Sequence, residues 1–153
     1  MSLVLFGHLL GSAMWIGGAL AGMLFAFAAR EEPPIIRAGM FRALARLHTV
    51  VIGIGAMLVV TTGIVLSMWL TTNGDADAMR EPRLWVMVVA GLAGGGVVLF
   101  VGLPTAVKMG GLAVASNDGH LPPAFEMYRR RQAVVSSVAG VLAVVALLAW
   151  KVL

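Results

Sequence analysis

The sequence is poor in two kinds of residue, cysteine and charge. None of its 153 residues is cysteine, which excludes disulfides, zinc–thiolate sites, iron–sulfur clusters and thiol catalysis. Charged residues make up only 12% of the chain, against about 25% in soluble domains. Hydrophobic residues make up 60%, and so few charges cannot cover the surface of a soluble protein of this size. The composition therefore indicates a single integral membrane domain.

Charged residues are absent from four long stretches of the chain, 3–29, 47–74, 84–107 and 132–150. Each stretch reaches or approaches the roughly 20 apolar residues that a helix needs to cross a bilayer. No stretch alternates apolar and polar side chains as a strand would. Pro34 and Pro123 suit a first helical turn and place two helix starts before the membrane. We predict an all-α bundle of four transmembrane helices, near 3–29, 34–70, 84–107 and 123–151.

The basic residues predict the orientation of these helices. The first and third loops hold 8 of the 11 Lys and Arg residues. Because cytoplasmic loops carry the excess of Lys and Arg, we expect both termini on the outer side of the cytoplasmic membrane. The run Arg129–Arg131 is expected to contact anionic lipid headgroups. It is not expected to bind nucleic acid, since no aromatic platform accompanies it.

The first helix carries a histidine within the bilayer, where ionisable residues are candidates for function. His8 shares one helical face with Gly11, Ser12 and Trp15, and Gly18 lies close to the same stripe. This face offers an imidazole and a track of small residues against which a flat macrocycle could lie. We predict a haem b site there with His8 as axial ligand. The alternative is a histidine at the membrane interface that is hydrogen-bonded to a neighbouring helix.

Other side chains extend this predicted site. His48, at the inner end of the second helix, is a candidate ligand for a second haem or an interfacial histidine. Met68 and Met87 are candidates for the second axial ligand at the level of His8, since thioethers can ligate haem iron or Cu(I). They could equally be apolar filling. Arg83 is a candidate partner for a haem propionate.

Glycines recur in the helices at the small-xxx-small spacing that lets helix backbones approach closely in lipid. The pairs are Gly7 with Gly11, Gly18 with Gly22, and Gly91 with Gly95. We expect the pair in the third helix to serve helix packing. Such faces also suit a close interface between two copies, so a homodimer or a larger redox complex is the expected assembly.

The stretch from His8 to Gly18 reads HLLGSAMWIGG. It resembles the first helix of HemJ-type membrane proteins and of CopD-like copper-resistance proteins. The second helix, with Arg46-Leu-His-Thr-Val and then Thr61-Thr62-Gly63, is similar to the same superfamily. So is the third helix, which opens with Leu84-Trp85. The resemblance covers three of the four helices, and its most specific part is the stretch in the first helix.

This resemblance implies two functions. HemJ-type proteins bind b-type haem through the first-helix histidine, which corresponds to His8, and oxidise protoporphyrinogen IX. CopD-like proteins imply copper transport. The leading hypothesis is a haem b-binding membrane protein that transfers electrons or serves in a membrane redox complex. A HemJ-like oxidase, a copper transporter and a cofactor-free assembly subunit are the alternatives.

Overall fold

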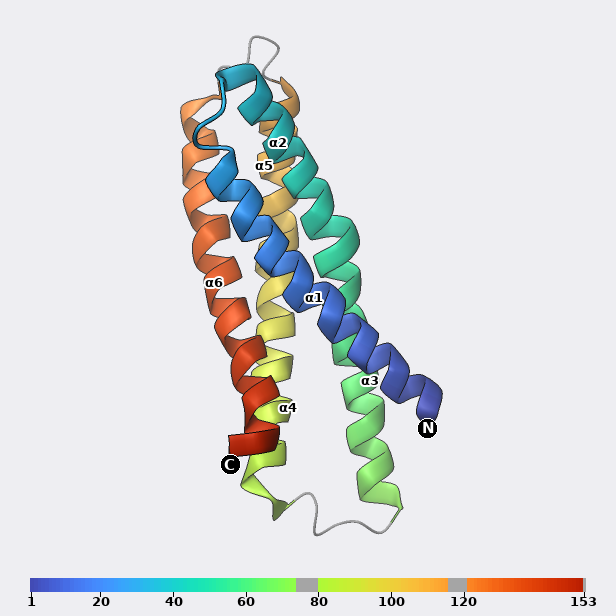
Figure 1. Cartoon of the computed structure of the whole chain (residues 1–153). Helices are drawn as coiled ribbons and strands as arrows, with labels where there is room; N and C mark the ends of the chain where they lie inside the picture. The colour runs from blue at the N-terminus through green and yellow to red at the C-terminus, as the bar shows by residue number, and fades with distance from the viewer. Residues whose placement is uncertain (74–79, 116–120, 153) are drawn as a thin grey trace.

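The structure, a computed structural model, describes residues 1–73, 80–115 and 121–152. Within these residues it consists of four long helical segments that run up and down in a bundle (Figure 1). They are α1 (Ser2–Ala28), then α2 (Pro34–Arg46) with η1 (Leu47–Ile52) and α3 (Gly53–Thr72), then α4 (Pro82–Gly96) with η3 (Val97–Gly102) and α5 (Leu103–Ala115), and α6 (Pro123–Val152). All four segments are long and apolar enough to cross a membrane. The predicted all-α class with four candidate spans is confirmed.

The third segment extends furthest beyond its expected bounds. It begins at Pro82 and continues to Ala115, past the predicted end at 107. The hydropathy pattern shows only which residues lie inside the bilayer. A helix can continue past the bilayer surface with its side chains in water. Pro104 does not end the helix, because the π-helical turn η3 ends two residues before it. Such a turn accommodates the missing N–H and the bulk of the proline ring.

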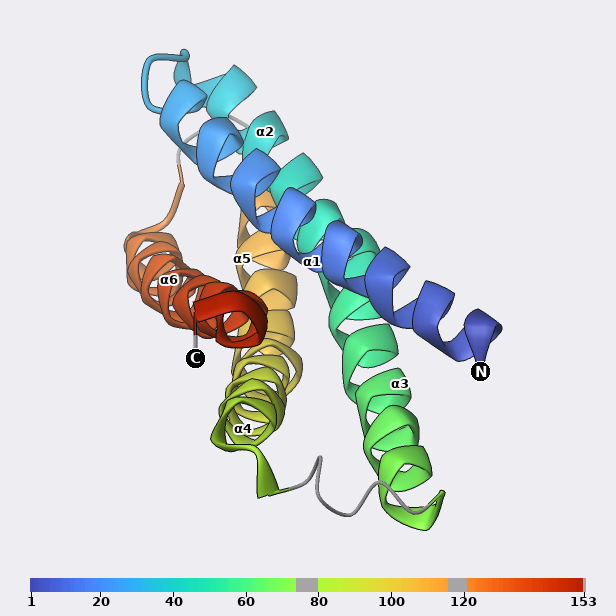
Figure 2. The ribbon, with the colours of Figure 1, turned by 60° about the horizontal axis from the view of Figure 1, so that its bottom comes forward.

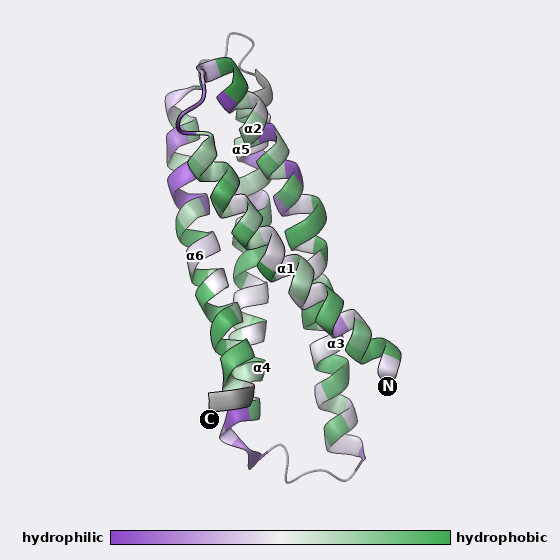
Figure 3. Cartoon of the chain, viewed as in Figure 1, coloured by the Kyte–Doolittle hydropathy of each residue, from purple (hydrophilic) through white to green (hydrophobic). Residues whose placement is uncertain are grey.

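The outer surface of the bundle is apolar. Leu3, Leu24 and Phe100 are 83%, 66% and 82% exposed. Hydrophobic residues cover the middle of the bundle, and hydrophilic residues gather at the end where α2 and α6 begin and at the start of α4 (Figure 3). A soluble monomer would not expose so continuous an apolar surface. The chain is therefore described as a multi-pass membrane protein.

α1 crosses α3 with the two backbones in contact. A Cβ atom added to Gly55 would lie 2.8 Å from the backbone nitrogen of Trp15 and 2.9 Å from the carbonyl oxygen of Gly11. Gly95 of α4 makes a similarly close contact with the side chain of Val60, whereas Gly91 has no neighbour within 4 Å of its added Cβ. Only one member of the pair expected in the third helix therefore serves close packing.

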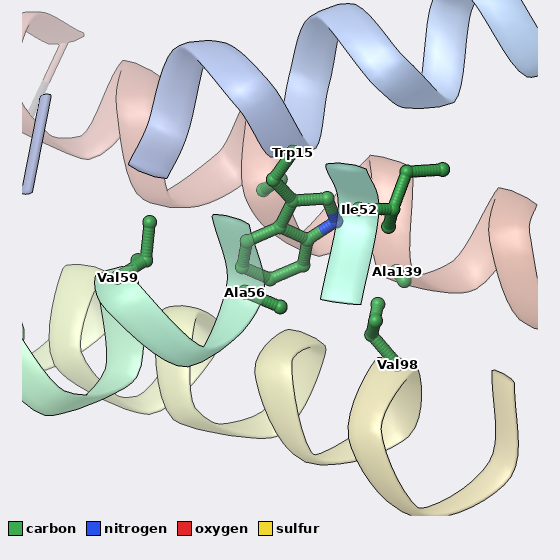
Figure 4. Close-up of a cluster of buried hydrophobic side chains, with 7 residues drawn as sticks. Trp15, Ile52, Ala56, Val59, Val98 and Ala139 are labelled. Atoms are coloured by element: carbon green, nitrogen blue, oxygen red, sulfur yellow. The ribbon is translucent and has the colours of Figure 1, made fainter. Parts of the chain in front are cut away.

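Trp15 stands at the centre of the bundle and is 3% exposed. Its indole ring packs in a cluster with Ile52, Ala56, Val59, Val98 and Ala139, which come from the other three segments (Figure 4). A second cluster closes the end of the bundle at which α2 and α6 begin. There the Phe41 and Phe125 rings meet edge to face, with centroids 4.9 Å apart.

Candidate functional site: a groove between α1 and α6

α1 and α6 make few contacts with each other and lie apart over much of their length (Figure 2). A groove of about 620 Å³ lies between them, with α2, η1 and α5 contributing to its floor. Its volume falls within the range of about 300–1,000 Å³ that is usual for cofactor sites. Most of its lining is apolar, and several of these side chains also belong to the exposed surface, such as Leu20, Met23, Val141 and Val144. The groove can therefore admit an apolar molecule from the bilayer.

His48 lies in the wall of this groove and is 8% exposed. Its Nδ1 is 3.0 Å from the carbonyl oxygen of Leu44, one turn earlier. A carbonyl oxygen only accepts hydrogen bonds, so Nδ1 carries the ring proton and, in the neutral imidazole, Nε2 keeps its lone pair. His48 lies in the π-helical turn η1. The bond to the Leu44 carbonyl holds its imidazole in one orientation.

Ser136 and Gln132 of α6 complete a polar chain with His48. The Ser136 hydroxyl lies 3.3 Å from His48 Nε2, to which it can donate, and the Gln132 amide nitrogen donates to Ser136 Oγ at 3.4 Å. Gln132 is 5% exposed, and its Oε1 has no hydrogen-bond partner among the described residues. A buried acceptor left without a partner costs about 1–3 kcal/mol. This oxygen is therefore a position where a donor from a ligand or water would stabilise the protein.

A small cavity lies behind the polar chain. It measures about 20 Å³ and shares Trp15, His48, Gln132 and Ser136 with the groove. A water needs about 10–15 Å³ of such space. The polar chain therefore separates a water-sized space from the large apolar groove.

Two arginines lie at the end of the groove where α1 ends and α6 begins. Arg30 follows α1 and stacks over the ring of Phe27, with its guanidinium carbon 5.0 Å from the ring centroid. Arg129 of α6 is paired with the carboxylate of Glu126 by hydrogen bonds of 2.7 and 2.6 Å. The groove is thus apolar along its length, polar on one wall and basic at one end.

The structure places His8 elsewhere. Its side chain is half-buried between α1 and α3, and Nδ1 lies 3.0 Å from the hydroxyl oxygen of Thr62. Thr62 in turn donates to the carbonyl of Leu58, so His8 Nδ1 is the donor in their bond. His8 lines neither the groove nor the small cavity. Its assignment as a haem ligand stays a prediction.

The glycine face of α1 is buried, but another helix of the same chain covers it. A Cβ atom on Gly11 would lie 2.8 Å from Leu58 Cβ, and one on Gly18 would lie 2.8 Å from Ile52 Cγ1. Ser12 bonds to the carbonyl of His8 at 2.8 Å. The expected wall for a flat macrocycle at Gly11 and Gly18 is therefore filled by α3 and η1. Trp15, from the same face, does reach the groove.

The other predicted ligands also lie away from the groove. Met68 of α3 is 62% exposed, and Met87 of α4 lines neither space. Arg83 pairs with Glu81 at 3.2 Å at the start of α4. Among the residues that the structure describes, no three His, Asp or Glu side chains gather as a metal site.

Sequence reasoning missed Gln132, Ser136 and Arg30 as members of a site. A signal for two of them was present, because a glutamine and a serine one helical turn apart entered an otherwise apolar segment, and polar groups within the bilayer are costly. The predicted site lay on the first helix, around His8, Ser12 and Trp15, and included neither Gln132 nor Ser136. No signal connected Ser136 with His48, since the two lie 88 residues apart in the sequence.

Neither a family model, nor a curated protein, nor a solved structure matches this chain.

Proposed function

We propose that the chain is a haem b-binding protein of the cytoplasmic membrane, with the macrocycle in the groove between α1 and α6 and His48 as the candidate axial ligand. We further propose that it transfers electrons, alone or in a membrane redox complex. Haem b supplies one-electron chemistry when bound.

The observation that carries this proposal is the orientation of His48. Its Nδ1 is held by the Leu44 carbonyl at 3.0 Å, and the ring lies in the wall of a groove of about 620 Å³. Histidines that bind metals commonly donate their other ring N–H to a carbonyl or carboxylate, which orients the ring. Nε2 is the nitrogen available to iron, once the weak contact with Ser136 at 3.3 Å is given up.

The remaining lining also suits a tetrapyrrole. Apolar side chains of α1 and α6 would contact the ring, and Arg30 and Arg129 at the basic end of the groove would face its propionates. Arg42 and Arg46, which lie close to His48 in the sequence, do not line the groove. Apart from His48, the residues that suit a tetrapyrrole therefore come from α1 and α6.

Blocking the groove tests this assignment. Gly140 lines the groove and has no neighbour within 4 Å of its added Cβ, so Gly140→Phe would fill the groove from α6. We expect purified wild-type protein, reconstituted with haem b, to show a Soret band and the α-band of a reduced b-type haem. The haem-to-protein ratio of Gly140→Phe should fall by at least about tenfold, because the ring would occupy the cofactor's space.

Gly91→Phe is the matched control. Gly91 of α4 also has open space at its added Cβ, but it does not line the groove. This variant should keep the wild-type haem content. Equal haem content in both variants would place the cofactor elsewhere, and wild-type protein without a Soret band would contradict haem binding. Turnover of added protoporphyrinogen would point to the HemJ-like oxidase instead of an electron carrier.

The proposed orientation predicts the location of reporters. A reporter fused after Leu153 should be external, and one inserted at Ser116 should be cytoplasmic, because the Lys- and Arg-rich loops stay inside. Alkaline phosphatase and green fluorescent protein fusions measure the two locations. The reverse pattern would show that the protein has the opposite orientation, with the basic end of the groove outside.

A further inference from the structure

Arg30 is held at the end of the groove by its own backbone and by a neighbouring ring. Its N–H donates to the carbonyl of Phe27 at 3.0 Å, and its carbonyl accepts a bond of 3.2 Å from Arg37. Arg37 also donates to Ala29 at 3.1 Å and to Glu32 at 3.0 Å, which orders the turn between α1 and α2. The guanidinium then rests over Phe27, a residue that lines the groove. The hydrogen-bonded turn between α1 and α2 thus holds Arg30 at the end of the groove.

The two arginines at this end differ in their partners. Glu126 accepts from Arg129 and, at 3.0 Å, also from Arg130, so its carboxylate compensates part of their charge. Among the described residues, no carboxylate lies within ion-pair distance of Arg30. Its interactions there are the backbone bonds and the stacking on Phe27. Arg30 is therefore the cation at this end that retains its capacity to bind an anion.

We infer that Arg30 binds the carboxylate of an amphipathic ligand whose apolar body lies in the groove. A guanidinium can donate two parallel hydrogen bonds to a carboxylate, and the apolar lining below it selects a molecule with an acid at one end only. If the ligand is haem b, which carries two propionates, this inference rests on the proposed function. A fatty acid has the same chemistry, and the experiment separates these two sources.

Three probes test the inference with protein in vesicles of phosphatidylcholine, which has no net charge to compete for Arg30. They are haem b, its dimethyl ester, in which both propionates are blocked, and oleate. Wild-type protein should bind haem b about tenfold or more tightly than the ester, because a hydrogen bond between charged groups is lost in the ester. Arg30→Gln should bind haem b as weakly as the ester and bind the ester as wild type does.

Arg131→Gln is the matched control. Arg131 is an exposed arginine of α6 that does not line the groove. Its variant loses the same charge and should keep the wild-type preference for haem b over the ester. A preference that persists in Arg30→Gln, or wild-type protein that binds haem b and the ester equally, would overturn the role of Arg30.

The probes also separate this inference from the proposed function. Binding of oleate that depends on Arg30, with no binding of haem b or the ester, would support the carboxylate site and contradict the haem protein. Binding of haem b and the ester with equal affinity would leave the haem protein intact and remove the carboxylate site. Binding of none of the three would contradict both.

Discussion

His48→Ala is expected to abolish the Soret band of protein reconstituted with haem b, whereas His8→Ala should leave it unchanged. The methyl group of alanine cannot coordinate iron, and among the described histidines it is His48 that lines the groove. His8 lies instead between α1 and α3, bonded to Thr62. The haem-to-protein ratio and the reduced spectrum of each variant measure the difference. This pair of variants decides between the ligand predicted from the sequence and the one that the groove favours.

His48→Ala also removes the bonds to Leu44 and Ser136, so lost binding needs a control for folding. Added imidazole should enter the space left by the side chain and restore a b-type spectrum in the variant. Circular dichroism and thermal unfolding should show a folded helical protein in either condition. If His8→Ala lost the haem and His48→Ala kept it, the cofactor would belong to the α1–α3 interface. Full haem in both variants would exclude both histidines as required ligands.

The second large effect is expected in stability. Gly11→Leu should lower the thermal unfolding temperature in detergent, because its Cβ would lie 2.8 Å from Leu58 Cβ and 2.9 Å from the carbonyl oxygen of Gly55. Backbone cannot move aside as a flexible side chain can, so α1 must shift away from α3. Overpacking of this kind costs about 1–3 kcal/mol and occasionally more.

Gly17→Leu makes the same chemical change in the same helix. Nothing lies within 4 Å of an added Cβ at Gly17, so this variant should unfold at the wild-type temperature. Equal losses in the two variants would contradict the close crossing of α1 and α3. If a haem lay against the small residues of α1, as the sequence predicts, Gly11→Leu would instead displace the haem from a stable protein. A stable Gly11→Leu variant without haem would restore a cofactor at that face.

Much of the helical architecture could be read from the sequence, because the signals for it are local. Hydropathy over roughly 20 residues predicts a membrane-spanning helix wherever that stretch occurs. Pro34 and Pro123 predicted the starts of α2 and α6, since proline fits a first turn in any context. The spacing of Gly11, Trp15 and Gly18 likewise predicted one face of α1, and these residues are buried in the structure. A helical face follows from the 3.6-residue period alone.

What covers that face, and where a ligand can lie, was decided only by the tertiary structure. Gly11 and Gly18 of α1 could have served a cofactor or another helix, and in the structure they pack against α3 and η1. The contact between His48 and Ser136 joins η1 to α6, and the groove requires α1 and α6 to diverge. The sequence by itself determined which segments enter the membrane and which of their faces carry small residues. Their pairing depends on side-chain shapes distant in the chain, so it arose only when the four segments packed together.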